Sequence, residues 1–100
     1  MKLELVKDNA NLTVKVEGRL DTMTAPELEK TLKENLEPVT NLVFDFEELV
    51  YVSSAGLRVL LSTQKTMNAK KGSMVIRHVD EEVMDVFDVT GFSDILTIEN

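Results

Sequence analysis

Alternating apolar and polar positions at the start of the chain predict two β-strands. Segment 2–5 alternates charged residues with leucine, and the same period of two returns in Leu12, Val14 and Val16. A period of two with one polar face is typical of a sheet that exposes one face to water. The segment 8–11 between the two runs reads Asp-Asn-Ala-Asn, which favours a turn. We therefore expect the two strands to form an antiparallel hairpin.

The spacing of the apolar residues then lengthens to four, which predicts an amphipathic helix after Thr24. Thr24 and Glu27 have the spacing of a capping box, in which each side chain accepts a backbone N–H of the first turn. Pro26 suits that first turn, and Pro38 is expected to end the helix. The residues expected on its buried side are Leu28, Leu32 and Leu36.

Two more helices are expected in the second half of the chain. One follows Ser53 and Ser54, and Gly72 is expected to end it in the left-handed conformation. The other begins after the cap residue Asp80 and ends at Gly91. The side chains expected to face the core are Leu57, Leu60, Leu61 and Met67 in the first of these helices and Val83, Val86 and Phe87 in the second.

Short apolar runs between the helices predict the remaining strands. These runs cover residues 41–46, 49–52, 74–76 and 95–98. Strands that alternate with helices indicate crossover connections within one sheet. The predicted fold is α/β, with a single domain over residues 1–100. It combines a mixed β-sheet, an N-terminal antiparallel hairpin and crossover helices in the order ββαβαβαβ.

Composition and charge narrow the classes of function. The chain contains no cysteine, which excludes disulfides, thiolate catalysis and cysteine-bound metals. Its net charge of −7 disfavours nucleic acids and anionic membranes as partners, because both are anionic. No apolar run approaches the roughly 20 residues that a membrane span needs, and the first residues lack the apolar core of a signal peptide. We expect a cytoplasmic protein without membrane insertion.

A serine hydrolase is the first enzyme class to consider, and the sequence does not support it. Ser54 resembles half of a nucleophile elbow, but Val52 stands where that motif has its first glycine. His78 is the only histidine, and no acidic residue lies between Ala55 and Arg77 to complete the usual order of serine, acid and histidine. We therefore expect no enzyme activity.

Metal and nucleotide sites have no support from motifs. One carboxylate cluster contains Asp45, Glu47 and Glu48, and a second spans residues 80–82. Neither has the spacing of a calcium loop or a histidine companion. No glycine-rich phosphate-binding motif is present. We expect neither a metal nor a cofactor.

The segment 53–56, Ser-Ser-Ala-Gly, lies where a strand is expected to end and a helix to begin. Serine is a favoured N-cap, so one of the two serines has an ordinary structural explanation. The second hydroxyl is spare. Ala55 and Gly56 leave the first turn without large side chains, which favours access by a partner. The N-terminus of a helix accepts anions, so the domain would tolerate a phosphate on Ser54 without unfolding.

Several blocks of the sequence resemble the STAS domain family, and specifically the bacterial anti-sigma factor antagonists. The segment 49–60, Leu-Val-Tyr-Val-Ser-Ser-Ala-Gly-Leu-Arg-Val-Leu, resembles the signature of the family. The segments 18–21 (Gly-Arg-Leu-Asp), 43–46 and 87–92 resemble further blocks in the same order. The resemblance extends over essentially the whole chain.

The resemblance implies a partner-switching cycle. The unphosphorylated antagonist binds an anti-sigma factor that is also a serine kinase, and this releases a sigma factor for transcription. The kinase phosphorylates the antagonist, which ends the binding, and a PP2C-type phosphatase reverses the modification. Alignment on Gly56 places the phosphorylated serine at Ser54, with Ser53 as the alternative. The residues expected to bind the partner are Asp21, Thr22, Ser53, Ser54, Ala55, Gly56 and Arg58.

This chain departs from the sporulation and stress antagonists of the family at two positions. They carry an aspartate where this chain has Ser53, and a second hydroxyl residue where it has Ala55. Two other functions stay open. A STAS domain can dock on the ATPase of an ABC transporter, in which case the serine loop would be a docking surface. A weak nucleotide hydrolase is the third possibility, and capture of the partner or a turnover assay would separate the three.

Overall fold

The computed structural model describes residues 1–99. Strands β1 (Lys2–Asp8) and β2 (Asn11–Leu20) form the predicted antiparallel hairpin, with Leu3 opposite Val16 and Leu5 opposite Val14. Asn9 in the turn has a φ of 56°, a conformation that asparagine adopts more readily than most residues. The antiparallel hairpin is therefore formed as the alternating pattern predicts.

The rest of the chain adds parallel strands to β2. The elements are α1 (Ala25–Asn35), β3 (Asn41–Asp45), β4 (Leu49–Val52), α2 (Ser54–Ala69), β5 (Ser73–Arg77), α3 (Glu81–Thr90), a 3-10 turn (Phe92–Asp94) and β6 (Ile98–Glu99). Within the described chain the strand order is β1-β2-β3-β5-β6, and β4 pairs with the last residues of β2. The predicted mixed sheet with crossover helices is confirmed. The predicted order has one strand between the first two helices, whereas the chain forms two strands there, β3 and β4.

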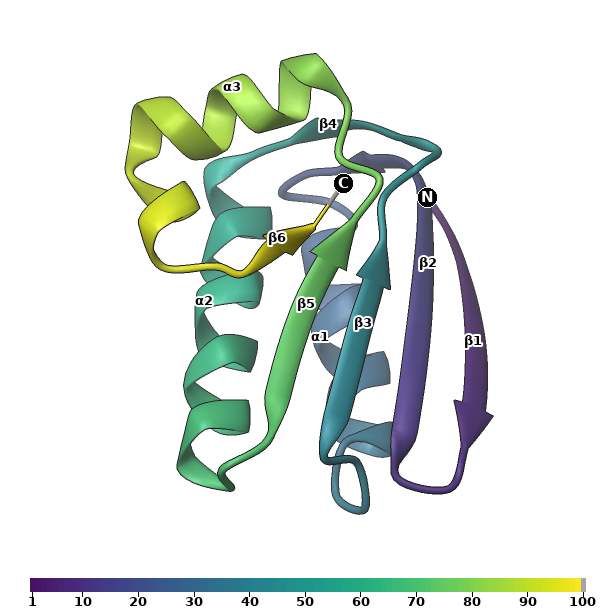
Figure 1. The fold of residues 1–100 in the computed structure, drawn as a ribbon. Helices are drawn as coiled ribbons and strands as arrows, with labels where there is room; N and C mark the ends of the chain where they lie inside the picture. The colour runs from purple at the N-terminus through teal and green to yellow at the C-terminus, as the bar shows by residue number, and fades with distance from the viewer. Residues whose placement is uncertain (100) are drawn as a thin grey trace.

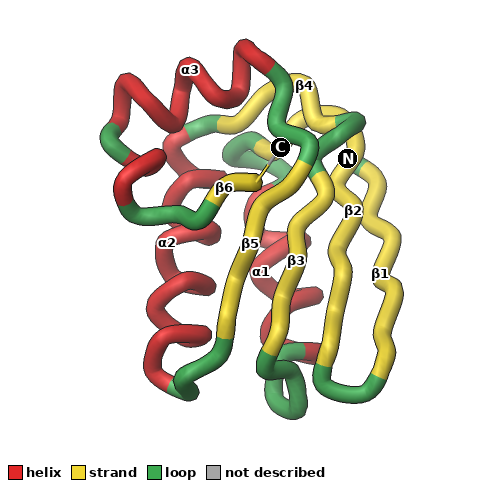
Figure 2. The backbone as a smooth tube through the Cα atoms, viewed as in Figure 1, coloured by secondary structure: helices red, strands yellow, loops and turns green. Residues whose placement is uncertain are grey.

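The helices are distributed unevenly over the sheet. Helices α1 and α2 lie side by side behind the sheet, and α3 lies across its end, close to β4 (Figures 1 and 2). The core between the sheet and the first two helices holds Leu12, Val14, Leu28, Leu32, Leu42, Phe44, Leu60 and Met67, each at most 2% exposed. Leu61, expected in this core, is only partly buried.

The end of α2 differs from the predicted one. Gly72 was expected in the left-handed conformation, but Lys71 adopts it, with a φ of 58°. Gly72 is required for a different reason, because a Cβ at this position would lie 2.6 Å from the carbonyl oxygen of Thr40. Lys70, at the end of α2, donates from its side chain to the carbonyl oxygens of Leu36 and Glu37 after α1.

The last predicted strand is shorter than expected. Residues 95–98 were predicted as a strand, but Ile95 and Leu96 belong to the bend after the 3-10 turn, and β6 covers Ile98–Glu99. The side chain of Leu96 extends from this bend into the core and is buried. The apolar residue at this position therefore contributes to packing and not to a strand. The third helix matches its prediction, with Asp80 accepting the N–H of Val83 at 2.8 Å and Gly91 in the left-handed conformation.

Candidate functional site

The junction of β4 and α2 separates the roles of the two serines. Ser53 is the N-cap, and its Oγ accepts the N–H of Gly56 at 3.3 Å. Its own N–H donates to the carbonyl oxygen of Leu20 at 2.8 Å, which ties the start of the helix to the end of β2. Ser53 is half-buried. The first serine is therefore a structural cap.

Ser54 is the first residue of α2, and its side chain is exposed. Within residues 1–99 its hydroxyl makes no hydrogen bond. The first turn of α2 contains no acidic residue, whereas α1 and α3 both have acids in theirs. The positive end of the helix dipole is thus not compensated by a side chain at this position. The free hydroxyl of Ser54 lies where a negative group would be accepted.

Gly56 has a packing role that the sequence did not reveal. It is buried, and a Cβ here would lie 2.7 Å from Cγ of Leu20 and 3.0 Å from the carbonyl oxygen of the same residue. The missing side chain lets the first turn of α2 approach the end of β2 closely. The expectation that Gly56 mainly leaves the surface open to a partner is therefore replaced by a structural role. Ala55 beside it is partly buried.

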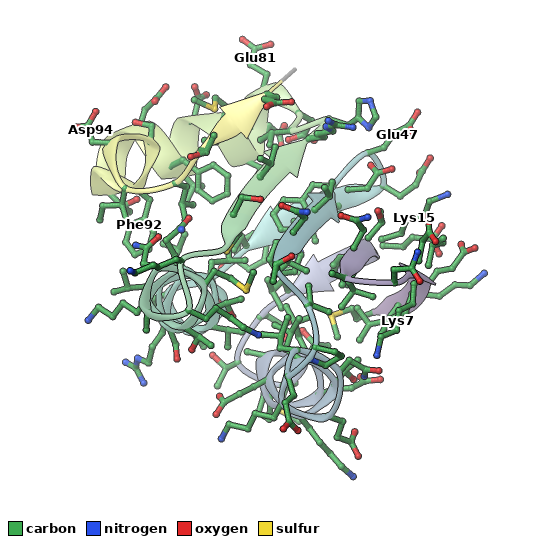
Figure 3. The ribbon with its side chains drawn as sticks, turned by 60° about the horizontal axis from the view of Figure 1, so that its bottom comes forward. Lys7, Lys15, Glu47, Glu81, Phe92 and Asp94 are labelled. Carbon is green, nitrogen blue, oxygen red and sulfur yellow. The ribbon has the colours of Figure 1, made fainter. Side chains whose placement is uncertain are left out.

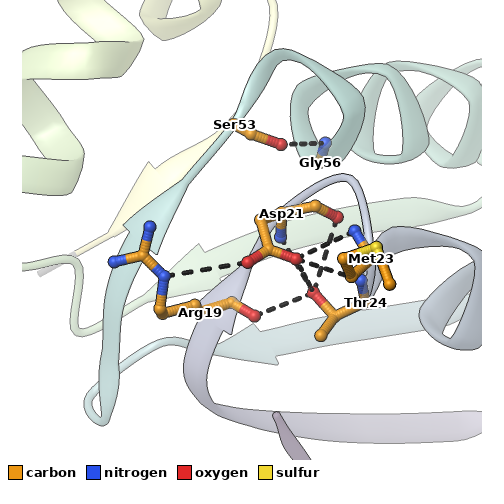
Figure 4. Close-up of polar contacts among 6 residues, drawn as sticks. All are labelled: Arg19, Asp21, Met23, Thr24, Ser53 and Gly56. Atoms are coloured by element: carbon orange, nitrogen blue, oxygen red, sulfur yellow. Dashed lines mark hydrogen bonds and ion pairs between the residues drawn. The ribbon is translucent and has the colours of Figure 1, made fainter.

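The loop between β2 and α1 is organised by Asp21 (Figure 4). Its Oδ1 accepts the N–H groups of Met23 at 3.0 Å and Thr24 at 3.1 Å. The Thr24 hydroxyl accepts the N–H of Asp21 and donates to the carbonyl oxygen of Arg19, both at 2.8 Å. The predicted capping box is wrong, because the Thr24 side chain makes no cap hydrogen bond within α1. The side chain that accepts backbone N–H groups here is that of Asp21, and these groups belong to the loop before α1.

These contacts also set the charge of Asp21. Partial burial alone would raise the pKa of the carboxyl group, but the N–H groups of Thr24 and Met23, the Thr24 hydroxyl and the Arg19 guanidinium together lower it by more. The resulting pKa lies below the ordinary value of 3.8, so Asp21 is ionised at neutral pH. The loop therefore presents a fixed negative charge.

Arg19 connects this loop to β4. Its Cζ lies 4.1 Å from the centre of the Tyr51 ring, and its Nε lies 3.7 Å from Oδ2 of Asp21. Arg19 and Tyr51 are paired residues of the neighbouring strands β2 and β4. A guanidinium over an aromatic ring is a stabilising arrangement, and it leaves Arg19 already engaged. Arg58, which is exposed on α2, has no ion pair within the part of the chain that the structure describes.

Exposed apolar side chains border the site, and no pattern in the sequence pointed to them as a group. Met23 is 86% exposed in the loop beside Asp21, and Val50 and Tyr51 of β4 are 55% and 39% exposed. Exposed apolar side chains grouped near one another are typical of a surface that binds another protein. Met23, an apolar residue between polar ones in a short loop, was the one feature of the sequence that could have indicated this surface. Thr22, a predicted partner-binding residue, is exposed in the same loop.

His78 does not belong to this site. Its Nδ1 lies 3.0 Å from Oδ1 of Asp45 at the end of β3, and no hydrogen bond joins it to Ser53 or Ser54 within residues 1–99. The geometry of a serine hydrolase is thus not formed between these residues. The expectation that the carboxylates of segment 45–48 lack a histidine companion is wrong, because the pairing of β3 with β5 brings His78 to Asp45.

No helix within residues 1–99 combines the length and the apolar character that crossing a bilayer requires.

The model of the STAS domain family matches residues 2–100. The anti-sigma-B factor antagonist of Bacillus subtilis (strain 168) is 32% identical over 94 residues, which are 93% of this chain and 86% of that protein.

The fold is also similar to solved structures. The anti-sigma factor antagonist SpoIIAA in its unphosphorylated form has a TM-score of 0.79 at 17% identity, over 99% of this chain and 88% of that one. The Bacillus cell fate determinant SpoIIAA in its phosphorylated form has a TM-score of 0.78 at 17% identity, over 99% and 92% of the two chains. With the family model covering nearly every residue, this chain belongs to the STAS domain family.

Proposed function

We propose that this chain is an anti-sigma factor antagonist controlled by phosphorylation of Ser54. In its unphosphorylated form it binds an anti-sigma factor that is also a serine kinase, and the sigma factor is released for transcription. The observation that carries the proposal is the exposed hydroxyl of Ser54 at the start of α2, beside a serine that already caps the helix. The relative named anti-sigma-B factor antagonist supports the same function.

The proposed binding surface surrounds the first turn of α2 and the loop between β2 and α1. Asp21 supplies a fixed charge, and Met23 and Tyr51 supply exposed apolar area beside it. Gly56 is buried, so its part is to position the helix rather than to contact the partner. The surface comprises Asp21, Thr22, Ser53, Ser54, Ala55 and Arg58, with Met23 and Tyr51 added.

Phosphorylation would act on the interface rather than on the fold. A phosphate adds about −1.5 to −2 charges at neutral pH. The N-terminus of α2 stabilises such a group in the free domain, by about 0.3–1 kcal/mol when it is exposed. A partner that covers Ser54 offers no such compensation unless it places a cation there. A charge buried in an interface without its counterpart costs about 2–5 kcal/mol, so binding should weaken while the domain stays folded.

The chain acts by binding in this proposal, without a cofactor of its own. ATP belongs to the partner kinase, and a PP2C-type phosphatase restores the unphosphorylated form. The cycle takes place in the cytoplasm, where sigma factors meet RNA polymerase. Neither serine is paired with His78 within the described chain, so the serine–histidine pair of a hydrolase is not formed there.

A capture and release experiment tests the proposal. The purified chain is used as bait in a lysate of its own organism, and the captured proteins are identified by mass spectrometry. We expect an anti-sigma factor with a kinase domain, and we expect the purified chain to displace a sigma factor from it. Ser54→Asp should displace the sigma factor poorly, whereas Ser62→Asp, an exposed position further along α2, should act like the wild type. Capture of a membrane ATPase without any sigma-factor release would contradict the proposal.

A further inference from the structure

A second group of polar side chains lies at the carboxyl ends of β3 and β5. Asp45 is the last residue of β3, Glu47 follows it in the turn to β4, and His78 follows the last residue of β5. One ligand atom from each of the three residues lies within 4.8 Å of the other two. The N–H of Phe46 donates to the carbonyl oxygen of Arg77 at 2.9 Å, which fixes the two strand ends relative to each other. The carboxyl ends of neighbouring parallel strands are common positions for ligand sites.

We propose that Asp45, Glu47 and His78 form a binding site for a divalent transition metal, with zinc as the ion of choice. One imidazole and two carboxylates are ligands that zinc accepts, with Zn–N and Zn–O distances of about 2.0–2.2 Å. An imidazole ligand also favours transition metals over magnesium and calcium, which prefer oxygen ligands alone. This proposal is independent of the proposed function, because none of the three residues belongs to the surface around Ser54.

The geometry of the three side chains is close to what such an ion needs. Two ligands of a tetrahedral zinc ion are about 3.3–3.5 Å apart, as follows from those bond lengths. Nδ1 of His78 and Oδ1 of Asp45 are 3.0 Å apart, so a small separation makes room for a metal between them. Glu47 is exposed and projects from the turn after β3 (Figure 3), so its carboxylate has room to turn toward the ion.

The surroundings of Asp45 hold its carboxylate in place. Its Oδ1 accepts the N–H of Glu47 at 3.1 Å and lies 3.0 Å from Nδ1 of His78. Lys15 opposes the binding of a metal ion, because its positive charge lies near the site. It is paired with Asp45 across β2 and β3 and lines the same surface hollow as Glu47. Its positive charge should weaken the site without abolishing it.

Calorimetry with zinc chloride and untagged protein tests the site. We expect one zinc ion per chain. Asp45→Asn and His78→Asn should each weaken binding at least about tenfold, since even partners outside the coordination sphere are worth about 10–100-fold. Asparagine suits position 78 because His78 has a φ of 60°, which asparagine tolerates. Lys15→Gln should strengthen binding severalfold, because it removes the repelling charge.

Glu48→Gln is the matched control, because Glu48 is the adjacent exposed acid and lines the same hollow but is not one of the three proposed ligands. It should change the affinity by less than about twofold. His78 is the only histidine, so its ring signals in the NMR spectrum of the wild type report on ligation without overlap. We expect these signals to shift with one equivalent of zinc. No binding by the wild type, unshifted histidine signals, or an equal loss in Glu48→Gln and Asp45→Asn would overturn the proposal.

Discussion

Replacing Ser53 with alanine should destabilise the domain, whereas the same change at Ser54 should not. Ser53 Oγ accepts the N–H of Gly56, and this is the side-chain cap of α2. Loss of a serine N-cap to alanine costs about 0.5–2 kcal/mol. The distance of 3.3 Å is at the long end of the usual range, so the lower half of that interval applies. We expect a loss of about 0.5–1 kcal/mol in the free energy of unfolding, or about 2–8 °C in Tm for a chain of this size.

The hydroxyl of Ser54 makes no hydrogen bond within residues 1–99, so Ser54→Ala should change stability by no more than about 0.5 kcal/mol. Thermal and urea unfolding followed by circular dichroism measure both variants under the same conditions. Ser53→Asp is the control, because aspartate caps helices as well as serine does and its charge suits the N-terminus. A stable Ser53→Ala together with a destabilised Ser54→Ala would refute the assignment of the cap.

The remaining stability predictions concern Gly56 and Asp21. Gly56→Ala should destabilise the domain by about 1 kcal/mol. Crowding of the new Cβ against Leu20 costs about 1–3 kcal/mol, and the higher helix propensity of alanine offsets about 1 kcal/mol of this cost. Unchanged urea unfolding would contradict this prediction. The pKa of Asp21 is lowered in the folded chain, so the unfolded chain binds more protons between the two pKa values. The contribution of Asp21 to stability is therefore present above the unfolded value of 3.8 and is lost as the pH falls from there through the lower pKa of the folded chain. Asp21→Asn should therefore flatten the acid side of the stability profile, and an unchanged profile would contradict the role of this charge.

Local patterns in the sequence predict most of the elements, because each pattern and its caps lie within one segment. The alternation in segment 2–16 gives the hairpin, and Asp80 and Gly91 bound α3 as expected. The Thr24 cap fails because the Thr24 hydroxyl is engaged by the N–H of Asp21 and the carbonyl oxygen of Arg19 instead. These partners lie at the end of β2, whose last residues pair with β4.

The features that the sequence did not reveal depend on contacts between distant segments. Gly72 is needed because the carbonyl oxygen of Thr40 lies close to it, and no local turn signal reports that contact. Asp45 and His78 are 33 positions apart, and only the register of β3 against β5 brings them together. The resemblance to STAS domains predicted the region of the candidate site, and the cap geometry then separated the two serines that the sequence presents as neighbours.

An aspartate stands in the position of Ser53 in the sporulation and stress antagonists that the chain resembles. The cap geometry offers a physical reason why both residues suit this position. Serine and aspartate each place one acceptor oxygen where the N–H of Gly56 needs it. This departure from the family pattern therefore preserves the start of α2, and it leaves the proposed role of Ser54 unchanged.

The affinity of the phosphorylated chain for its captured anti-sigma factor tests the proposed switch at Ser54. The partner kinase and ATP are used to phosphorylate the wild type, Ser53→Ala and Ser54→Ala, and mass spectrometry locates the phosphate. Calorimetry then compares the phosphorylated and unphosphorylated wild type. We expect phosphate on Ser54 in the wild type and in Ser53→Ala, none in Ser54→Ala, and an affinity that falls about 30- to 4,000-fold on phosphorylation. Phosphate on Ser53, or equal affinities of the two forms, would contradict the proposed control of binding by Ser54.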